Sequence, residues 1–160
     1  MIVREYDLIL EEDTRHSKLE IKQSFRYEQR NFNSASEVCR LMIERYNLHQ
    51  KADEYVYMLS FDARMKLLGI FEIGHGIVNG CLIDSRGIFM RAVFVGAKHI
   101  IIVHNHPSGE VEPSQDDKIM NRKIGDAGKL MDISLIDNII MGSNSFYTFK
   151  SSIETIYIIL

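Results

Sequence analysis

Short segments of the chain show either the two-residue alternation or the continuous apolar run that is typical of β-strands. Residues 54–61 show this alternation, and the short polar segment 62–64 separates them from a second apolar stretch. Residues 99–104 are apolar through their middle, as expected of a strand that is buried on both faces. The predicted strands are residues 54–61, 67–73, 99–104, 133–141 and 146–149.

The spacing of apolar residues predicts three helices between these strands. The first begins after Ser34, because Ser34 and Glu37 form a capping-box pattern ahead of an apolar stripe. Asp84 or Ser85 can cap the second helix, and the third spans residues 114–130. Residues expected on the buried faces are Val38, Leu41 and Met42, then Ile88, Phe89, Ala92 and Val93, and finally Met120, Ile124, Ala127 and Met131.

Because helices interleave with strands, we predict an α/β (α+β) fold in which a mixed sheet is flanked by helices. Residues 33–152 form the predicted domain. Residues 1–32 are expected to be an N-terminal extension that packs on this domain, with a strand at 1–10 followed by solvated, edge-like charges. Residues 153–160 are expected to be a C-terminal tail. Regular structure is expected to break at Gly74, Gly76 and Gly80.

The composition is that of an ordinary globular protein. The 160 residues suffice for one domain, and 46% hydrophobic against 26% charged residues allow a buried core. The net charge of −3 lacks the basic excess typical of nucleic-acid-binding proteins. Apolar runs such as residues 100–103 are far too short to span a membrane, and the first residues contain no apolar secretory segment. Two cysteines, Cys39 and Cys81, fit a reducing interior, so we expect a cytoplasmic protein without a membrane partner.

Potential metal ligands follow directly after the strand predicted at residues 99–104. His104 and His106 are two residues apart, so their imidazoles can project to the same side of an extended chain. Pro107 fixes its own φ and Gly109 permits a turn, so the strand stops and the chain changes direction. The two imidazoles are therefore expected at the end of a buried strand.

The chain returns at Ser114, where a helix is predicted to start, and Asp117 falls in the first turn of that helix. Neutral imidazole nitrogens and carboxylate oxygens are ligands that zinc accepts. His104, His106 and Asp117 thus make three ligands for one Zn²⁺ ion and leave a fourth position open for water. That arrangement is typical of catalytic zinc sites.

Each part of this group also has a simpler interpretation. A lone His-x-His pair at a strand end is more often two polar residues than a metal site. Ser114 and Asp117 are also what a helix N-terminus favours, since the hydroxyl caps the helix and the carboxylate meets its dipole. The two interpretations are compatible, because a cap can also orient a ligand. Their occurrence together within fourteen residues favours the metal site.

The string His104-Asn-His106-Pro, followed by Ser114-x-x-Asp117, resembles the metal motif of the JAB/MPN (JAMM) metalloproteases, which have a cytidine-deaminase-like fold. The longer string His-Asn-His-Pro-Ser-Gly and the late segment Leu-Ile-Asp-Asn-Ile-Ile-Met-Gly resemble the RadC branch of this fold. The resemblance covers residues 33–150. It implies that the two histidines and the aspartate bind zinc, and that the serine helps to hold the catalytic water and the oxyanion.

The resemblance also implies a glutamate general base on an upstream strand, and the matching residue is Glu54. A carboxylate at the start of an apolar strand can accept a proton from water that zinc has made acidic. On the residues alone, the better interpretation of Glu54 is a solvated charge beside Lys51 and Asp53, and it is the resemblance that favours the base. Glu72 is the rival base, since it also lies in a predicted strand, but the residues around it do not match the family pattern.

Three segments depart from the family pattern. In the late strand, Asp137-Asn138 replaces the usual Asp-His pair. Gly74-His75 replaces the usual Gly-Thr, and the three residues from Asp84, Asp-Ser-Arg, replace the usual Pro-Arg-Glu before the middle helix. None of these residues is a metal ligand, so the departures concern contacts with the substrate. Outside the motif, His75 is the histidine that could line the cleft.

We therefore predict a zinc hydrolase of the JAMM type that cleaves an amide, isopeptide or peptide bond in a peptide or protein substrate. One alternative is a binding or scaffold module without turnover, although all five motif positions are filled. A second alternative is a DNA-associated RadC-like accessory protein, in DNA repair or on a mobile element. The net charge of −3, and a sequence without the helix-hairpin-helix region of longer RadC proteins, count against independent binding of duplex DNA.

Overall fold

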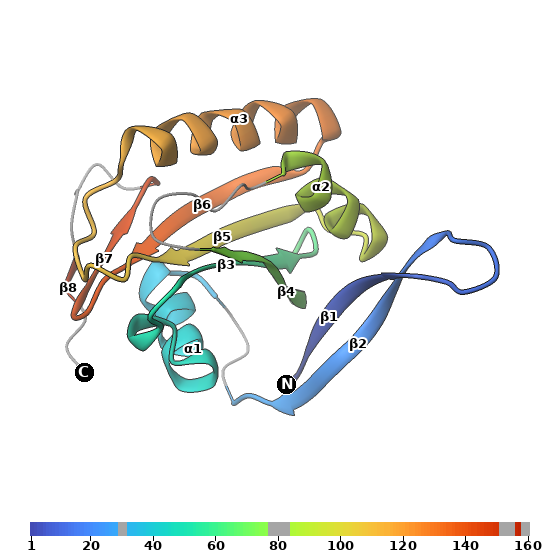
Figure 1. Ribbon diagram of the computed structural model, residues 1–160, viewed down its shortest axis with the longest axis horizontal. Coiled ribbons are helices and arrows are strands. Elements are labelled where there is room, and N and C mark those ends of the chain that lie inside the picture. The colour runs from blue at the N-terminus through green and yellow to red at the C-terminus, as the bar shows by residue number, and fades with distance from the viewer. Residues whose placement is uncertain (29–31, 77–83, 151–155, 158–160) are drawn as a thin grey trace.

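Strands from both ends of the chain join one mixed sheet in the computed structural model, which describes residues 1–28, 32–76, 84–150 and 156–157 (Figure 1). Within these residues the sheet has eight strands in the order β2-β1-β4-β3-β5-β6-β7-β8. The strands are β1 (Ile2–Leu10), β2 (Ser17–Arg26), β3 (Glu54–Phe61), β4 (Leu67–Gly76), β5 (His99–Asn105), β6 (Ser134–Met141), β7 (Ser145–Thr148) and β8 (Ile156–Tyr157). The helices are α1 (Ala35–Tyr46), α2 (Ser85–Phe94), α3 (Gln115–Met131) and a short 3-10 helix at Leu48–Gln50. None of these described helices combines the length and the apolar character that crossing a membrane requires.

The centre of the sheet consists of β3, β5 and β6. β3 is antiparallel to β4 on one side and to β5 on the other. β5 and β6 are parallel, and α3 lies in the crossover between them. Residues 100–103 and 139–141 are at most 4% exposed, because both faces of the sheet are covered. This burial explains why the apolar runs in these strands are continuous.

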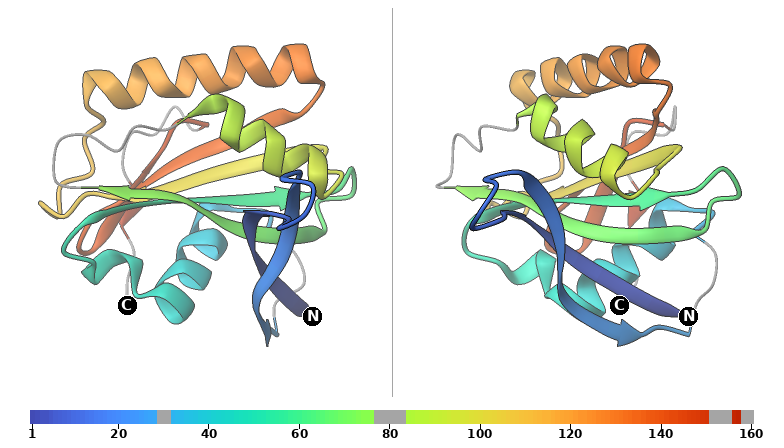
Figure 2. Two further views of the ribbon diagram at one scale, coloured as in Figure 1. Left: turned by 45° about the vertical axis from the view of Figure 1, so that its right-hand side comes forward. Right: turned by 90° about the vertical axis from the view of Figure 1, so that its right-hand side faces the viewer.

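The helices cover the two faces of the sheet unequally. α1 lies on one face, and α2 and α3 lie on the other (Figure 2). Ile101 and Val103 pack in the core beneath α1, whereas Ile100 and Ile102 pack beneath α2 and α3. Successive side chains of a strand point to opposite faces, so His104 projects to the side of α2 and α3.

β1 and β2 form a long antiparallel hairpin at the edge of the sheet, and β1 also pairs with β4 in parallel at Glu5. Glu5 is only 2% exposed. Its carboxylate accepts hydrogen bonds from Tyr46 (3.0 Å) and Gln23 (2.7 Å) and pairs with the ammonium group of Lys22 (3.0 Å). These contacts attach the hairpin to the rest of the sheet. The predicted domain boundaries, at residues 32 and 152, stay a prediction.

The structure confirms the predicted fold class, and the predicted strands and helix starts agree with it to within a few residues. Two expectations are wrong. Gly74 and Gly76 do not interrupt regular structure, because both pair with β3 inside β4; Gly80 lies outside the described residues. Val93 and Met131, both expected on the buried faces of their helices, have 54% and 47% of their surface exposed.

The cap of α1 can be tested by a single substitution. The Ser34 hydroxyl accepts a hydrogen bond from the Glu37 backbone N–H (3.3 Å), and the Glu37 carboxylate accepts one from the Ser34 backbone N–H (3.0 Å). Ser34→Ala should lower the free energy of unfolding by about 1 kcal/mol in urea denaturation. The control Ser36→Ala, inside the helix, should change it by less than about 0.5 kcal/mol. Equal losses in the two variants would contradict the capping role.

Candidate metal centre

β5 ends beside the start of α3, and the turn after β5 directs a second histidine toward the first. His104 is fully buried near the end of β5. The pairing of β5 with β6 continues past Asn105, where the His106 backbone N–H donates to the carbonyl of Met141 at 2.9 Å. Gly109 has a φ of +83°, a left-handed conformation that glycine adopts without a steric penalty. The predicted turn after the two histidines is therefore present.

Ser114 and Asp117 form a capping box at the N-terminus of α3. The Asp117 backbone N–H donates to the Ser114 hydroxyl oxygen at 3.1 Å. Asp117 Oδ2 accepts hydrogen bonds from the Ser114 backbone N–H (2.8 Å) and from the Ser114 hydroxyl (2.5 Å). The capping interpretation of this pair is confirmed. The other carboxylate oxygen of Asp117, Oδ1, faces His104.

Atoms of three side chains converge at this junction. His104 Nε2 lies 3.1 Å from Asp117 Oδ1 and 3.2 Å from His106 Nε2. His106 Nε2 lies 3.5 Å from Asp117 Oδ2. Ligands of a tetrahedral zinc ion, bound at about 2.0–2.2 Å, stand roughly 3.3–3.5 Å from one another. The spacing therefore suits a metal ion, which this group could hold.

The second nitrogen of each imidazole decides whether Nε2 is free to bind a metal. His106 Nδ1 lies 3.0 Å from the carbonyl of Glu110, which can only accept a hydrogen bond. Nδ1 therefore carries the proton, and Nε2 of the neutral ring keeps its lone pair. Among the described residues no hydrogen-bond partner reaches the buried Nδ1 of His104, whereas its Nε2 faces Asp117 and His106. The donor set fits an ion that accepts imidazole nitrogen and carboxylate oxygen.

The charges at the site favour the binding of a cation. Burial alone would raise the pKa of Asp117, but hydrogen bonds with His104, His106 and Ser114 hold this pKa far below its usual range. Burial alone would lower the pKa of His106, but the hydrogen bond to Asp117 and its charge outweigh burial and raise this pKa. Asp117 is thus ionised at neutral pH and attracts a cation to the two imidazoles.

Glu54, the predicted general base, begins β3 on the same face of the sheet as His104. In the ladder between β3 and β5, Val56 stands opposite His104. Glu54 lies two residues before Val56, so its side chain projects to the same face. Its charge also contributes to the raised pKa of His106, as expected of a carboxylate near the site.

Glu72, the rival base, lies on the opposite face of the sheet. Its carboxylate accepts a hydrogen bond from the Tyr57 hydroxyl (3.4 Å) and pairs with the His75 ring (3.0 Å) and the Lys22 ammonium group (3.7 Å). Tyr57 packs in the core beneath α1, so the sheet separates this group from the metal ligands. The geometry therefore favours Glu54 as the base. It also places His75 away from the metal centre.

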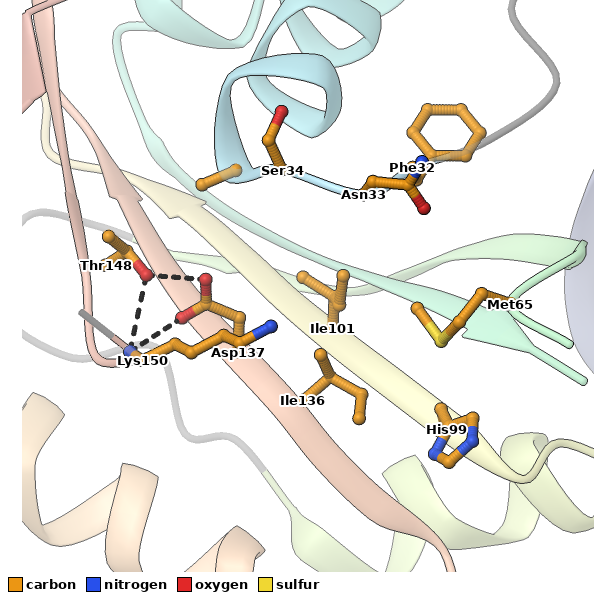
Figure 3. A pocket seen from close by; sticks show the side chains of 11 residues that line it. Phe32, Asn33, Ser34, Met65, His99, Ile101, Ile136, Asp137, Thr148 and Lys150 are labelled. Carbon is orange, nitrogen blue, oxygen red and sulfur yellow. Dashed lines mark hydrogen bonds between the residues drawn. The ribbon is translucent and has the colours of Figure 1, made fainter. Parts of the chain in front are cut away.

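A cavity of about 650 Å³ lies on the α1 side of the sheet, and not at the metal centre. Figure 3 shows Asp137 at one end of this cavity, where its carboxylate accepts hydrogen bonds from the Thr148 hydroxyl and the Lys150 backbone N–H. Burial raises the pKa of Asp137 in spite of these bonds. Ile101, which faces α1, also lines the cavity. The sheet therefore separates the cavity from the metal ligands.

Two residues near the site are not singled out by the sequence analysis. Asn105 is 1% exposed and hydrogen-bonds to the start of β3. Gly142 lies against the turn that follows His106, where a Cβ would stand 2.2 Å from the Gly109 carbonyl oxygen. A single asparagine or glycine has no distinctive pattern, because its role depends on neighbours from other strands.

Comparisons with known proteins agree with this arrangement. A model of the family described as "RadC-like JAB domain" matches residues 32–154. A UPF0758 protein of Clostridium perfringens is 36% identical over 115 residues, which cover 72% of this chain and 50% of the relative. UPF0758 proteins of Geotalea uraniireducens (36% over 118 residues, covering 74% and 51%) and Geobacter sulfurreducens (32% over 107 residues, covering 67% and 47%) are also similar. The chain spans about half the length of these curated relatives, whose names state no activity.

The contact between Gly142 and the turn after His106 can be tested by substitution. In Gly142→Ala, the new Cβ would meet the Gly109 carbonyl oxygen and, at 2.7 Å, the Val111 side chain. Such overpacking should lower the free energy of unfolding by about 1–3 kcal/mol in urea denaturation. The control Gly125→Ala, in α3 with open space around it, should raise it by about 0.5–1 kcal/mol. Wild-type stability of Gly142→Ala would contradict the close approach.

Proposed function

This chain belongs to the RadC-like JAB domain family, and from that premise we propose that it is a zinc-dependent hydrolase of the JAMM type. Its substrate is a peptide or protein in which it cleaves an amide, isopeptide or peptide bond. One observation carries the proposal: His104, His106 and Asp117 each present a ligand atom within 4.8 Å of the others. Three protein ligands with an open position are typical of catalytic zinc sites.

The types of ligand support zinc as the metal. Magnesium and calcium prefer shells made of oxygen atoms, whereas two imidazoles and one carboxylate suit zinc. Within the described residues, His104, His106 and Asp117 form the one group of potential ligands with this spacing. We therefore propose one zinc ion per chain.

Glu54 moves the proton in the proposed reaction. A bound zinc ion supplies Lewis acidity, which makes water acidic near neutral pH and polarises a carbonyl group. Glu54 accepts a proton at a carboxylate oxygen while the water oxygen forms a bond to the carbonyl carbon. Glu54 then gives this proton to the leaving nitrogen as the C–N bond breaks. The products are a carboxylic acid and an amine, so the atoms of one water molecule are accounted for.

Ser114 supplies a hydrogen-bond donor at the edge of the centre. Its hydroxyl donates to Asp117 Oδ2, and this contact keeps the hydroxyl next to a metal ligand. In the proposed reaction, this hydroxyl exchanges its hydrogen bond to Asp117 for one to the oxyanion that develops as water attacks. One such donor typically contributes about 10²–10³-fold to the rate.

The two alternative functions, a binding module and a DNA-associated factor, would require different features of the chain. A binding or scaffold module needs the fold but has no use for a base at Glu54. A factor that acts on DNA needs a basic surface for phosphate contacts, which a net charge of −3 does not favour. Cys39 is buried and forms no disulfide within the described part of the chain, which is compatible with action in the reducing cytoplasm.

Zinc binding tests the ligand set directly. Metal-free protein should bind one equivalent of zinc, measured by elemental analysis after gel filtration, and His104→Ala should lose it. At a free zinc concentration 100 times the Kd, binding should stabilise the fold by about 2.7 kcal/mol. His16→Ala is the control, because His16 is exposed in the turn between β1 and β2. A full equivalent of zinc in His104→Ala would rule out this site.

Hydrolysis tests the roles of Glu54 and Ser114. Zinc-loaded protein is assayed on quenched fluorescent peptides and on isopeptides linked through a lysine side chain. Ser114→Ala should reduce kcat by about 10²–10³-fold. Glu54→Gln should reduce it further, up to about 10⁴-fold, because the proton has no acceptor. Both variants should keep one equivalent of zinc.

Glu72→Gln is the matched control for Glu54→Gln, because Glu72 lies on the other face of the sheet. It should cleave at the wild-type rate. If Glu54→Gln also cleaves at that rate, the assigned mechanism is wrong. A zinc-loaded wild type that cleaves none of the substrates would favour the module without turnover.

A further inference from the structure

Asn105, the residue between the two histidines, connects the metal centre to the strand that carries Glu54. Its side chain is almost fully buried. Oδ1 accepts a hydrogen bond from the Tyr55 backbone N–H at 2.8 Å. Nδ2 donates to the carbonyls of Asp53 (3.1 Å) and Lys51 (3.4 Å). The nitrogen and the oxygen of one side-chain amide therefore bond to three backbone groups within three residues of Glu54.

These bonds form where the two strands part. The backbone ladder between β3 and β5 ends at the pair Val56 and His104. Just beyond it β5 keeps its pairing with β6 alone, through Asn105 and the His106 N–H, which donates to the Met141 carbonyl. The residues of β3 before Val56 are therefore not paired with the β5 backbone in this ladder. Because a side-chain amide carries the same C=O and N–H groups as a peptide unit, Asn105 extends the ladder by one position.

We propose that Asn105 is a positioning residue that fixes the Glu54 carboxylate relative to His104, His106 and Asp117. The inference rests on the proposed function, because that function makes Glu54 the general base. A displacement of about 1 Å in a reacting group can cost on the order of 10²-fold in rate. The Asn105 side chain hydrogen-bonds to the start of β3 and not to the three ligands, so its loss should displace Glu54 and leave the ligands in place.

Two substitutions remove the amide in different ways. Asn105→Asp keeps the shape and the acceptor for Tyr55, but it removes both donors and brings a negative charge to the carbonyls of Lys51 and Asp53. Asn105→Leu keeps a similar volume and removes all three hydrogen bonds. Neither variant changes a metal ligand. Asn105→Asp serves alone if Asn105→Leu does not fold.

Kinetics and zinc content separate positioning from metal binding. Both variants should hold one zinc per chain, lose on the order of 10²-fold in kcat, and keep KM within about threefold of the wild type. In a Glu54→Gln background, either substitution should lower the residual rate by less than about threefold, because its effect passes through Glu54. An equal loss in both backgrounds, or loss of zinc from the single variants, would overturn the proposal.

Hydrogen exchange tests the same geometry without a substrate. Asn105→Leu should speed exchange of the amides of residues 52–56 by about tenfold or more, and leave those of residues 115–131 unchanged. Asn138→Leu is the matched control, since Asn138 is fully buried in β6 and its side-chain amide has no hydrogen-bond partner among the residues that the structure describes. This control should leave exchange at residues 52–56 unchanged.

The kinetic measurements and the hydrogen-exchange measurements together distinguish failure of this proposal from failure of the proposed function. Unchanged exchange at residues 52–56 in the Asn105 variants overturns the positioning role, whether or not the chain is a hydrolase. Faster exchange there, in a protein whose wild type cleaves no substrate, supports Asn105 as the residue that holds Glu54 in place. That second result overturns the hydrolase function alone.

Discussion

The metal centre depends on the register between β3 and β5. In their antiparallel ladder Val56 stands opposite His104, and the alternation of side chains then divides both strands between two faces. Glu54 and His104 share the face covered by α3, whereas Tyr57 and Glu72 lie on the face covered by α1. A slip of one residue would exchange the faces and put the sheet between the base and the ligands. The fold therefore determines which carboxylate can act at the centre.

Local patterns predict most of the fold. The strands from β3 to β7 follow the apolar alternation or continuous apolar runs, because covered faces require apolar side chains. Ser34, Asp84 and Ser114 mark the starts of the three α-helices, because each side chain accepts a hydrogen bond from a free backbone N–H of the first turn. The same logic predicts that the residues around Ser114 begin a helix next to the two histidines. The convergence of ligands could thus be foreseen from spacing.

Contacts between distant segments determine what the sequence alone does not predict. β2 is an edge strand with mostly exposed residues, so no regular apolar pattern marks it. β4 continues through Gly74 and Gly76 because β3 supplies its hydrogen-bond partners. The face on which Glu72 lies follows from an irregular register between β3 and β4 near Val56. The role of Asn105 likewise depends on where the backbones of two strands separate.

The identity of the atoms bound to zinc decides whether this ligand set is correct. X-ray absorption at the zinc edge of the loaded protein reports the number and type of these atoms. If His104, His106 and Asp117 hold the ion with one water, the spectrum will show two imidazole nitrogens and two oxygens at about 2.0–2.2 Å. A sulfur ligand at about 2.3 Å, or a shell with fewer than two imidazoles, would contradict this account.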